Sequence, residues 1–341
     1  MNTQLIKELS EIGGVSGREE AVREYILRQV ENHCTCQVDN LGNLICFKKG
    51  AATPKNTIML SAHMDEVGFI VTHIGEDGLL RFANVGGIDS RVTVGRCVLV
   101  GEQGVRGIIA TKAIHMVTEK EIDKPAKLSD LFIDIGASSK EEAEQAVALA
   151  DRVTFVPDYL EFGNGFIKNK ALDDRAGCAL LIEMIQKESL PFDTYFVFTT
   201  NEETGQAGAG PAAFAIGADI GIVVETTTAG DISGASEDKY VCHLGGGPVV
   251  SFMDKGTIYD HALYQLGFDT AKKLNIPCQT KRGVFGGNES RAVQAAGKGV
   301  RVMAVSMPAR YIHSPSCVLK TEDIDNTYKL LTALVGEVGN L

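Results

Sequence analysis

The chain has 341 residues, of which 44% are hydrophobic and 23% charged, and its formal net charge is −11. This length favours one large domain accompanied by a smaller one, and the composition is that of an ordinary globular protein. The negative charge argues against a nucleic-acid partner, because phosphate binding needs a basic surface. No run of about 18 uncharged apolar residues occurs, so the sequence predicts no membrane span.

The N-terminal segment and the cysteines indicate a cytoplasmic protein. Residues 1–14 lack a basic region followed by an apolar core, which predicts an amphipathic helix and not a signal peptide. Eight cysteines are scattered without a CxxC pair, and this favours reduced thiols over a disulfide framework. Cys34 and Cys36 could bind a metal, but we interpret them as small residues near a helix end.

The next elements are expected to be one core-facing helix followed by two strands. Ser16-Gly-Arg-Glu19 has the pattern of a capping box, and apolar residues at helical spacing follow it. A core-facing helix is therefore predicted over residues 17–32. Short apolar runs predict strands at 43–47 and 57–62.

The pattern changes after residue 66 to short alternating apolar runs separated by glycine. Such spacing predicts a small β-barrel or sandwich. The predicted strands cover residues 68–72, 78–82, 96–100, 105–109 and 151–156.

From about residue 161, helical and strand patterns alternate again, which is typical of an α/β sheet with helices on its faces. The sequence therefore predicts an α/β domain made of residues 1–65 and 161–341, interrupted by a β-rich insertion at 66–160. The later elements are predicted as helices over 175–187, 209–216, 260–274 and 322–338, and strands over 194–200, 220–225, 249–253 and 302–307.

Two adjacent carboxylates, Glu202 and Glu203, directly follow the predicted strand at 194–200. In open α/β sheets, ligands bind at the carboxyl ends of the strands. Two carboxylates there repel each other unless cations or a shared proton relieve them. One could coordinate a metal while the other takes a proton from metal-bound water, and the alternative is an exposed acidic turn.

Four further stretches end apolar runs in possible metal ligands. His63 and Asp65 are two apart on an extended segment, so Asp65 could accept the second ring N–H of His63 and fix its tautomer. Asp173 and Asp174 precede a helix, where either could be an N-cap or a bridging ligand. Glu225 ends another predicted strand, and His313 follows the strand at 302–307. Together these residues form an oxygen-rich dinuclear set suited to Zn²⁺, Co²⁺ or Mn²⁺.

The chain resembles the tetrahedral (TET-type) aminopeptidase family of dinuclear metallopeptidases, which includes glutamyl and deblocking aminopeptidases. The resemblance covers essentially the full length. It rests on motifs in the family's order: SAHMDEVGF, GGIDSRV, ALDDRAG, TTNEETGQAGA, VVETTTAGD, LGGGP and RYIHSP.

The resemblance implies a role for each residue of the site. His63 and Glu225 would hold one metal, Glu203 and His313 the other, and Asp173 would bridge them. Glu202 would be the general base and Asp65 would orient His63. Two divalent ions per subunit follow, with Zn²⁺ or Co²⁺ preferred and Mn²⁺ also compatible.

The resemblance also implies a fold and an assembly. Residues 1–65 and 161–341 would form a mixed-sheet, zinc-peptidase-like catalytic domain of the phosphorylase/hydrolase-like class. The insertion at 66–160 would be a PDZ-like β-barrel dimerisation domain, and the dimers would build a tetrahedral dodecamer. Two positions depart from the family pattern: Glu225, where many relatives carry Asp, and Asn288-Glu289, where relatives often have a Gly-Thr-Asp-Ala type sequence.

We therefore expect a metal-dependent aminopeptidase that hydrolyses N-terminal residues from peptides, with Glu202 activating a water that bridges the metals. A related dinuclear carboxypeptidase or aminoacylase would use the same ligands. A metal-independent glycosidase could use the glutamate pair alone. A non-catalytic scaffold would leave the spare carboxylate unexplained.

Overall fold

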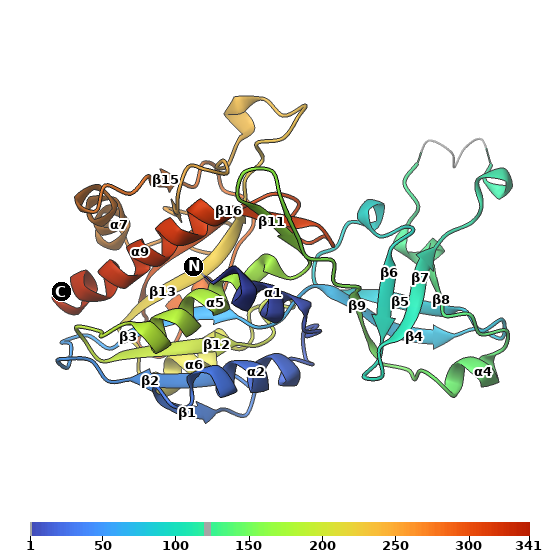
Figure 1. Ribbon diagram of the computed structural model, residues 1–341, viewed down its shortest axis with the longest axis horizontal. Helices are drawn as coiled ribbons and strands as arrows, with labels where there is room; N and C mark the ends of the chain where they lie inside the picture. The colour runs from blue at the N-terminus through green and yellow to red at the C-terminus, as the bar shows by residue number, and fades with distance from the viewer. Residues whose placement is uncertain (1, 119–123) are drawn as a thin grey trace.

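An eight-stranded mixed sheet forms the centre of the larger of two bodies in the computed structural model, which describes residues 2–118 and 124–341 (Figure 1). The strands follow the spatial order β1-β2-β12-β3-β13-β16-β14-β15. Their bounds are β1 Thr35–Val38, β2 Leu44–Lys48, β12 Thr194–Thr199, β3 Ile58–His63, β13 Ile220–Thr228, β16 Arg301–Ala309, β14 Val249–Val250 and β15 Gln279–Thr280.

The four central strands, β12, β3, β13 and β16, are mutually parallel. Parallel strands are buried on both faces, which explains why β3 reads as an almost continuous apolar run, and all six of its residues are buried. Because the strands are parallel, their carboxyl ends meet at one edge. The register places Thr199 at the end of β12 beside His63 at the end of β3.

Helices cover both faces of this sheet. One face packs against α1 Thr3–Glu11, α2 Glu20–Val30, α5 Leu172–Lys187, α7 His261–Lys273 and α9 Thr321–Gly339. The other face packs against α6 Ala209–Ile216 and the short α8 Ser290–Gln294. None of the helices within 2–118 and 124–341 has the length and apolar character needed to cross a membrane.

The smaller body is a closed six-stranded barrel in the order β4-β5-β8-β7-β6-β9 (Figure 1). Its core includes Phe69, Phe82 and Phe155, whose rings meet edge to face. Full closure leaves no exposed sheet edge. The bounds are β4 Gly68–Ile74, β5 Leu80–Val85, β8 Phe132–Asp134, β7 Val105–Ala110, β6 Cys97–Val100 and β9 Arg152–Phe155, with α4 Lys140–Glu144 packed outside.

A three-stranded antiparallel sheet leads the chain back from the barrel to the larger body. It consists of β10 Leu160–Phe162, β11 Phe166–Asn169 and β17 Cys317–Lys320. This sheet brings the segment before Asp173 beside the segment after His313. Short 3₁₀ turns complete the described elements: η1 Ser90–Val92, η2 Ile114–Met116, η3 Leu128–Asp130 and η4 Glu237–Lys239.

The mixed α/β pattern and the small β-barrel are confirmed, while several boundaries of the predicted elements were wrong. The helix predicted over 17–32 begins at Glu20, and Ser16 makes no capping bond to it. The strand predicted to end at Glu225 continues to Thr228, and the strand predicted at 249–253 is only two residues long. The six described strands absent from the prediction, β1, β8, β10, β11, β15 and β17, have two to four residues and little periodic signal.

Candidate active site

The structure brings the five predicted stretches together at the carboxyl edge of the parallel strands. His63 ends β3, and the Glu202-Glu203 turn follows β12. His313 follows β16, and Asp173 lies at the start of α5. Glu225 lies inside β13, yet its side chain reaches the same place because β13 runs beyond its neighbour β3.

The ring of His63 faces two carboxylates. Its Nε2 lies 3.6 Å from Asp173 Oδ1 and 3.5 Å from Glu225 Oε1, and all three side chains are buried. On the other side of the ring, Nδ1 lies 2.9 Å from the carbonyl oxygen of Asp65. This contact keeps a proton on Nδ1, which donates to the carbonyl oxygen, and leaves Nε2 free as a ligand.

The ring of His313 has a similar arrangement. Its Nε2 lies 3.4 Å from Asp173 Oδ2 and 3.3 Å from Glu203 Oε2. Its Nδ1 lies 2.9 Å from the carbonyl oxygen of Gly87, which follows the barrel strand β5. The two oxygens of Asp173 therefore face different histidines, which is the geometry of a bridging carboxylate.

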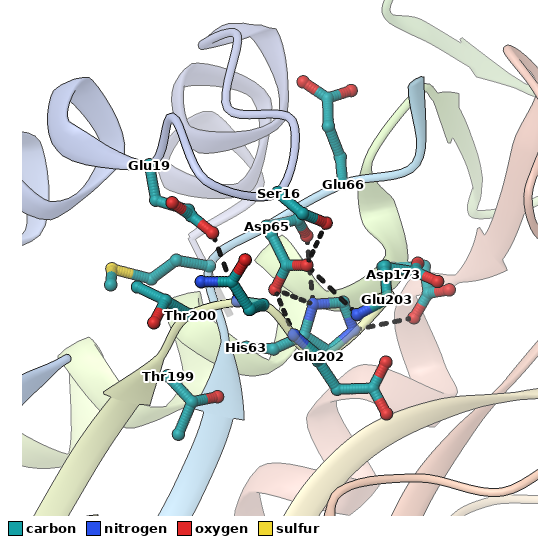
Figure 2. A network of polar contacts seen from close by, with 12 residues as sticks. Ser16, Glu19, His63, Asp65, Glu66, Asp173, Thr199, Thr200, Glu202 and Glu203 are labelled. Carbon is teal, nitrogen blue, oxygen red and sulfur yellow. Dashed lines mark hydrogen bonds and ion pairs between the residues drawn. The ribbon is translucent and has the colours of Figure 1, made fainter. Parts of the chain in front are cut away.

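Asp65 fastens the Glu202-Glu203 turn to the end of β3. Its carboxylate accepts hydrogen bonds from the main-chain N–H groups of Glu202, at 3.0 Å, and Glu203, at 3.1 Å (Figure 2). The Ser16 hydroxyl donates a third bond at 2.6 Å. The carboxylate of Asp65 is 3.5 Å from His63 Nδ1, so its own carbonyl, at 2.9 Å, is the nearer partner of that ring.

Asp173 and Asp174 divide the two roles considered for them. Both have non-helical backbone angles, after Ala171 in the left-handed region at φ 54°, so the regular part of α5 starts beyond them. Asp174 accepts a bond from the N–H of Gly177, as a capping residue does. Asp173 points into the site, where Thr226 donates its hydroxyl to Oδ1 at 2.8 Å.

The carboxylates of the site lie close together in a space that water reaches poorly. Burial raises the pKa of the Glu203 carboxyl to about 8, with the neighbouring charge of Asp173 adding to the shift. Burial also raises the pKa of Glu225 to about 7 and that of Glu202 well above its usual range. Bound cations would favour the ionised forms and relieve this repulsion.

The donor set fits divalent metal ions. A tetrahedral ion bound about 2.1 Å from each ligand atom holds those atoms about 3.4 Å apart. The four histidine-to-carboxylate distances lie between 3.3 and 3.6 Å. Two groups result, His63 with Asp173 and Glu225, and His313 with Asp173 and Glu203. Imidazole nitrogen with carboxylate oxygen is a donor combination favoured by Zn²⁺ and similar ions.

A pocket of about 440 Å³ opens in front of these residues. Glu202 lines it, and its carboxylate forms no hydrogen bond or salt bridge with the part of the chain that the structure describes. Lys281, Phe285 and Asn288 line the same pocket. The adjoining Glu289 is buried beneath the site, where it accepts a bond from the Thr199 hydroxyl at 2.6 Å.

Sequence reasoning did not assign a role in the site to Ser16, Glu19, Gly87, Thr226 or Lys281. Glu19 accepts the N–H of Asn201 at 3.1 Å, so both ends of the supposed capping box support the glutamate turn. Gly87 and Thr226 belong to motifs that carried the family resemblance, and that membership was the available signal. Nothing local to Lys281 marks it as a pocket residue.

A family model described as M42 glutamyl aminopeptidase matches residues 42–330. The chain belongs to this family. It is 38% identical to a putative aminopeptidase of Acetivibrio thermocellus over 97% of both chains. It is 34% identical to the lysyl aminopeptidase of Pyrococcus furiosus over 98% of this chain and 97% of that one. The chain is thus an aminopeptidase, a peptide hydrolase.

Solved structures agree with this M42 assignment. The aminopeptidase APDkam598 of the archaeon Desulfurococcus kamchatkensis superimposes with a TM-score of 0.93 at 32% identity, covering 98% of this chain and 94% of that one. The TET1 peptidase of Pyrococcus horikoshii, which can assemble into a tetrahedron or a large octahedral shell, gives 0.86 at 33% identity over 98% of both. A Thermotoga maritima protein named endoglucanase gives 0.81 at 39% identity over 98% of both.

Proposed function

We propose that this M42 aminopeptidase uses two divalent ions that share Asp173. The observation that carries the proposal is the placement of the two Asp173 oxygens toward different histidines. His63 and Glu225 would complete one site, and Glu203 and His313 the other. Zn²⁺ or Co²⁺ fits best, and Mn²⁺ is also compatible. When bound, such ions polarise the scissile carbonyl and lower the pKa of water.

Glu202 is the general base in this proposal. Its carboxylate lines the pocket without a partner in the described chain, while its main chain is held by Asp65. It would accept a proton as water attacks the peptide carbonyl and return that proton to the leaving amine. Asp65 is a positioning residue, because it acts on the glutamate turn and on His63 without facing the substrate pocket.

Removing the metals tests the proposal. Dialysis against a chelator should abolish hydrolysis of aminoacyl-nitroanilides, and added Zn²⁺ or Co²⁺ should restore it, because the proposed reaction needs the ions to polarise the scissile carbonyl. Metal analysis of the restored enzyme should give at least two ions per chain. Full activity in the chelated enzyme, or saturation with a single ion, would contradict the dinuclear proposal.

The Thermotoga maritima relative named endoglucanase gives the glycosidase alternative a specific basis. Glycoside hydrolysis by two carboxylates needs no metal. Cleavage of a β-glucan by the chelated protein would favour that alternative over the metal-dependent reaction. Assays with different peptides separate the three peptidase classes. An aminopeptidase needs a free N-terminus, an aminoacylase cleaves N-blocked substrates, and a carboxypeptidase needs only a free C-terminus.

Lys281 supports a proposal about substrate preference, on which the sequence motifs are silent. Its side chain is 7% exposed, and its ammonium forms no hydrogen bond or salt bridge with residues 2–118 or 124–341. Burial lowers the pKa of Lys281, and the nearby groups Asp254, Glu225 and Cys242 counter this shift only in part. A buried cation without a partner favours an acidic side chain on the substrate.

Replacing Lys281 with methionine should therefore lower kcat/KM for glutamyl-nitroanilide by roughly 10- to 100-fold, the value of a hydrogen bond to a charged group. Hydrolysis of leucyl-nitroanilide should change little. Lys255→Met is the matched control, since Lys255 is exposed and lies outside the pocket lining. Equal losses for both substrates would contradict a role in selecting acidic residues.

The remaining proposals concern organisation. We propose that residues 1–65 and 161–341 form a zinc-peptidase-like catalytic domain and that 66–160 form a PDZ-like dimerisation domain. The closed barrel and the shells built by the Pyrococcus horikoshii relative support this division and a tetrahedral dodecamer assembled from six dimers. A cytoplasmic location is supported by the eight free cysteines.

A further inference from the structure

Three cysteines meet at the edge of the main sheet. Cys34 follows the end of α2, Cys36 lies on the edge strand β1, and Cys46 lies on β2 (Figure 1). Cys36 and Cys46 are directly opposite each other in the antiparallel register. The Sγ of Cys36 lies 3.5 Å from that of Cys34 and 3.4 Å from that of Cys46. All three Sγ atoms lie within 4.8 Å of one another.

These distances suit a shared ion. A metal bound tetrahedrally at about 2.3 Å from each sulfur holds the sulfurs about 3.8 Å apart. A disulfide would join only two of the thiols, at about 2.05 Å, and would leave the third unused. Within the described chain, no other cysteines form a group of this kind.

The surroundings favour thiolate ligands with access from one side. Cys46 is buried, whereas Cys34 and Cys36 are half-buried, so an ion can enter from solvent. The ammonium of Lys48 is near enough to interact electrostatically with Cys34, and it is held in place by the carbonyl of Ile185. A nearby cation offsets part of the negative charge that three thiolates bring to one ion.

We propose that Cys34, Cys36 and Cys46 form a binding site for one thiophilic d¹⁰ metal ion such as Zn²⁺ or Cd²⁺. The site is chemically distinct from the aminopeptidase centre, whose proposed ligands are nitrogen and oxygen atoms. Binding releases the thiol protons to solvent and leaves one coordination position for water. The ion would join β1 to β2 and to the end of α2, fixing an edge strand that otherwise has a single neighbour.

The test titrates the intact, zinc-loaded enzyme with Cd²⁺ in a reductant that contains no thiol. The thiolate-to-cadmium charge-transfer band in the ultraviolet should grow and saturate at one Cd²⁺ per chain. Cys36→Ser should lose this band while keeping aminopeptidase activity, which reports that the variant has folded. Cys97→Ser is the matched control and should keep the band, since Cys97 is exposed and outside the cluster.

Cysteines near the catalytic centre do not confuse the result. Cys178 and Cys317 are buried behind that centre, and both remain in Cys36→Ser, so a band that arises from them would persist. A band of unchanged size in Cys36→Ser, or no band in the wild-type enzyme, would overturn the proposal.

Alkylation of the wild-type enzyme gives an independent measurement if Cys36→Ser does not fold. With free Cd²⁺ at about ten times its dissociation constant, mass action should slow the modification of Cys34 and Cys36 about tenfold. Peptide mass spectrometry would follow each cysteine, and Cys97 should react at the same rate throughout. Unprotected Cys34 and Cys36, or a Cys36–Cys46 disulfide in place of metal binding, would contradict the site.

Discussion

Glu202→Gln is expected to lower kcat by roughly 10²- to 10⁴-fold, the range for loss of a general base. Glutamine keeps the shape of the side chain, and the main-chain bond from residue 202 to Asp65 does not depend on the side chain. The proposed metal ligands are also untouched, because Glu202 belongs to neither group of possible ligands in the described chain. The loss should therefore appear in kcat at full metal content.

Steady-state kinetics and metal analysis on the same preparation measure this effect. Glu203→Gln is the informative neighbour, since it should lose metal affinity as well as activity. Glu161→Gln, an exposed carboxylate on β10, should behave as wild type. Robust turnover by Glu202→Gln, or a fall in activity matched by a fall in bound metal, would remove Glu202 from the role of base.

Glu66→Gln is expected to lower the free energy of unfolding by about 3–5 kcal/mol, because it breaks a buried ion network and leaves cations uncompensated. The Glu66 carboxylate is buried and accepts from Lys170 Nζ at 2.7 and 2.9 Å. Arg175, also buried, lies 3.9 Å away. Main-chain N–H of Gly14 and the hydroxyl of Thr154 bond to the same carboxylate.

Urea unfolding of the metal-loaded enzyme measures the change. Glu337→Gln is the matched control: Glu337 pairs with Lys273 at 2.9 Å on the surface, where a pair contributes about 0–1 kcal/mol. Adding Lys170→Met to Glu66→Gln should recover part of the lost unfolding free energy, because it removes one of the buried cations left without a carboxylate partner. Equal effects of Glu66→Gln and Glu337→Gln would mean that the network is not stabilising.

The sequence indicated the residues that line the site better than the residues that hold them in position. His63, Glu203 and His313 follow or end apolar runs, and parallel strands bring such positions together by topology alone. Ser16 and Glu19 matched a local capping motif, yet Ser16 donates its hydroxyl to Asp65, and Glu19 accepts from Asn201 as well as from the neighbouring Gly17. A local pattern cannot reveal which distant partner will compete for the same hydrogen bond.

The remaining errors of the sequence prediction concern strands and their pairing. The four-residue β1 was not predicted, so the contact of Cys36 with Cys46 was not foreseen, although Cys36 had been considered as a metal ligand. Glu225 was expected to end its strand, but β13 pairs with β16 up to Thr228 and so extends further. Short strands carry little periodicity, and their pairing is decided by neighbours elsewhere in the chain.

If His313 holds a metal as we propose, its bond from Nδ1 to the carbonyl of Gly87 gives the barrel side of the molecule a part in the reaction. The residue that orients this imidazole is encoded in the insertion and not in the segments that build the large sheet. Glu66 also links the barrel to the larger body, because its carboxylate accepts bonds from Gly14 and from Thr154 on β9. An evolutionary or engineered exchange of the barrel would therefore have to preserve one main-chain carbonyl, whatever sequence surrounds it.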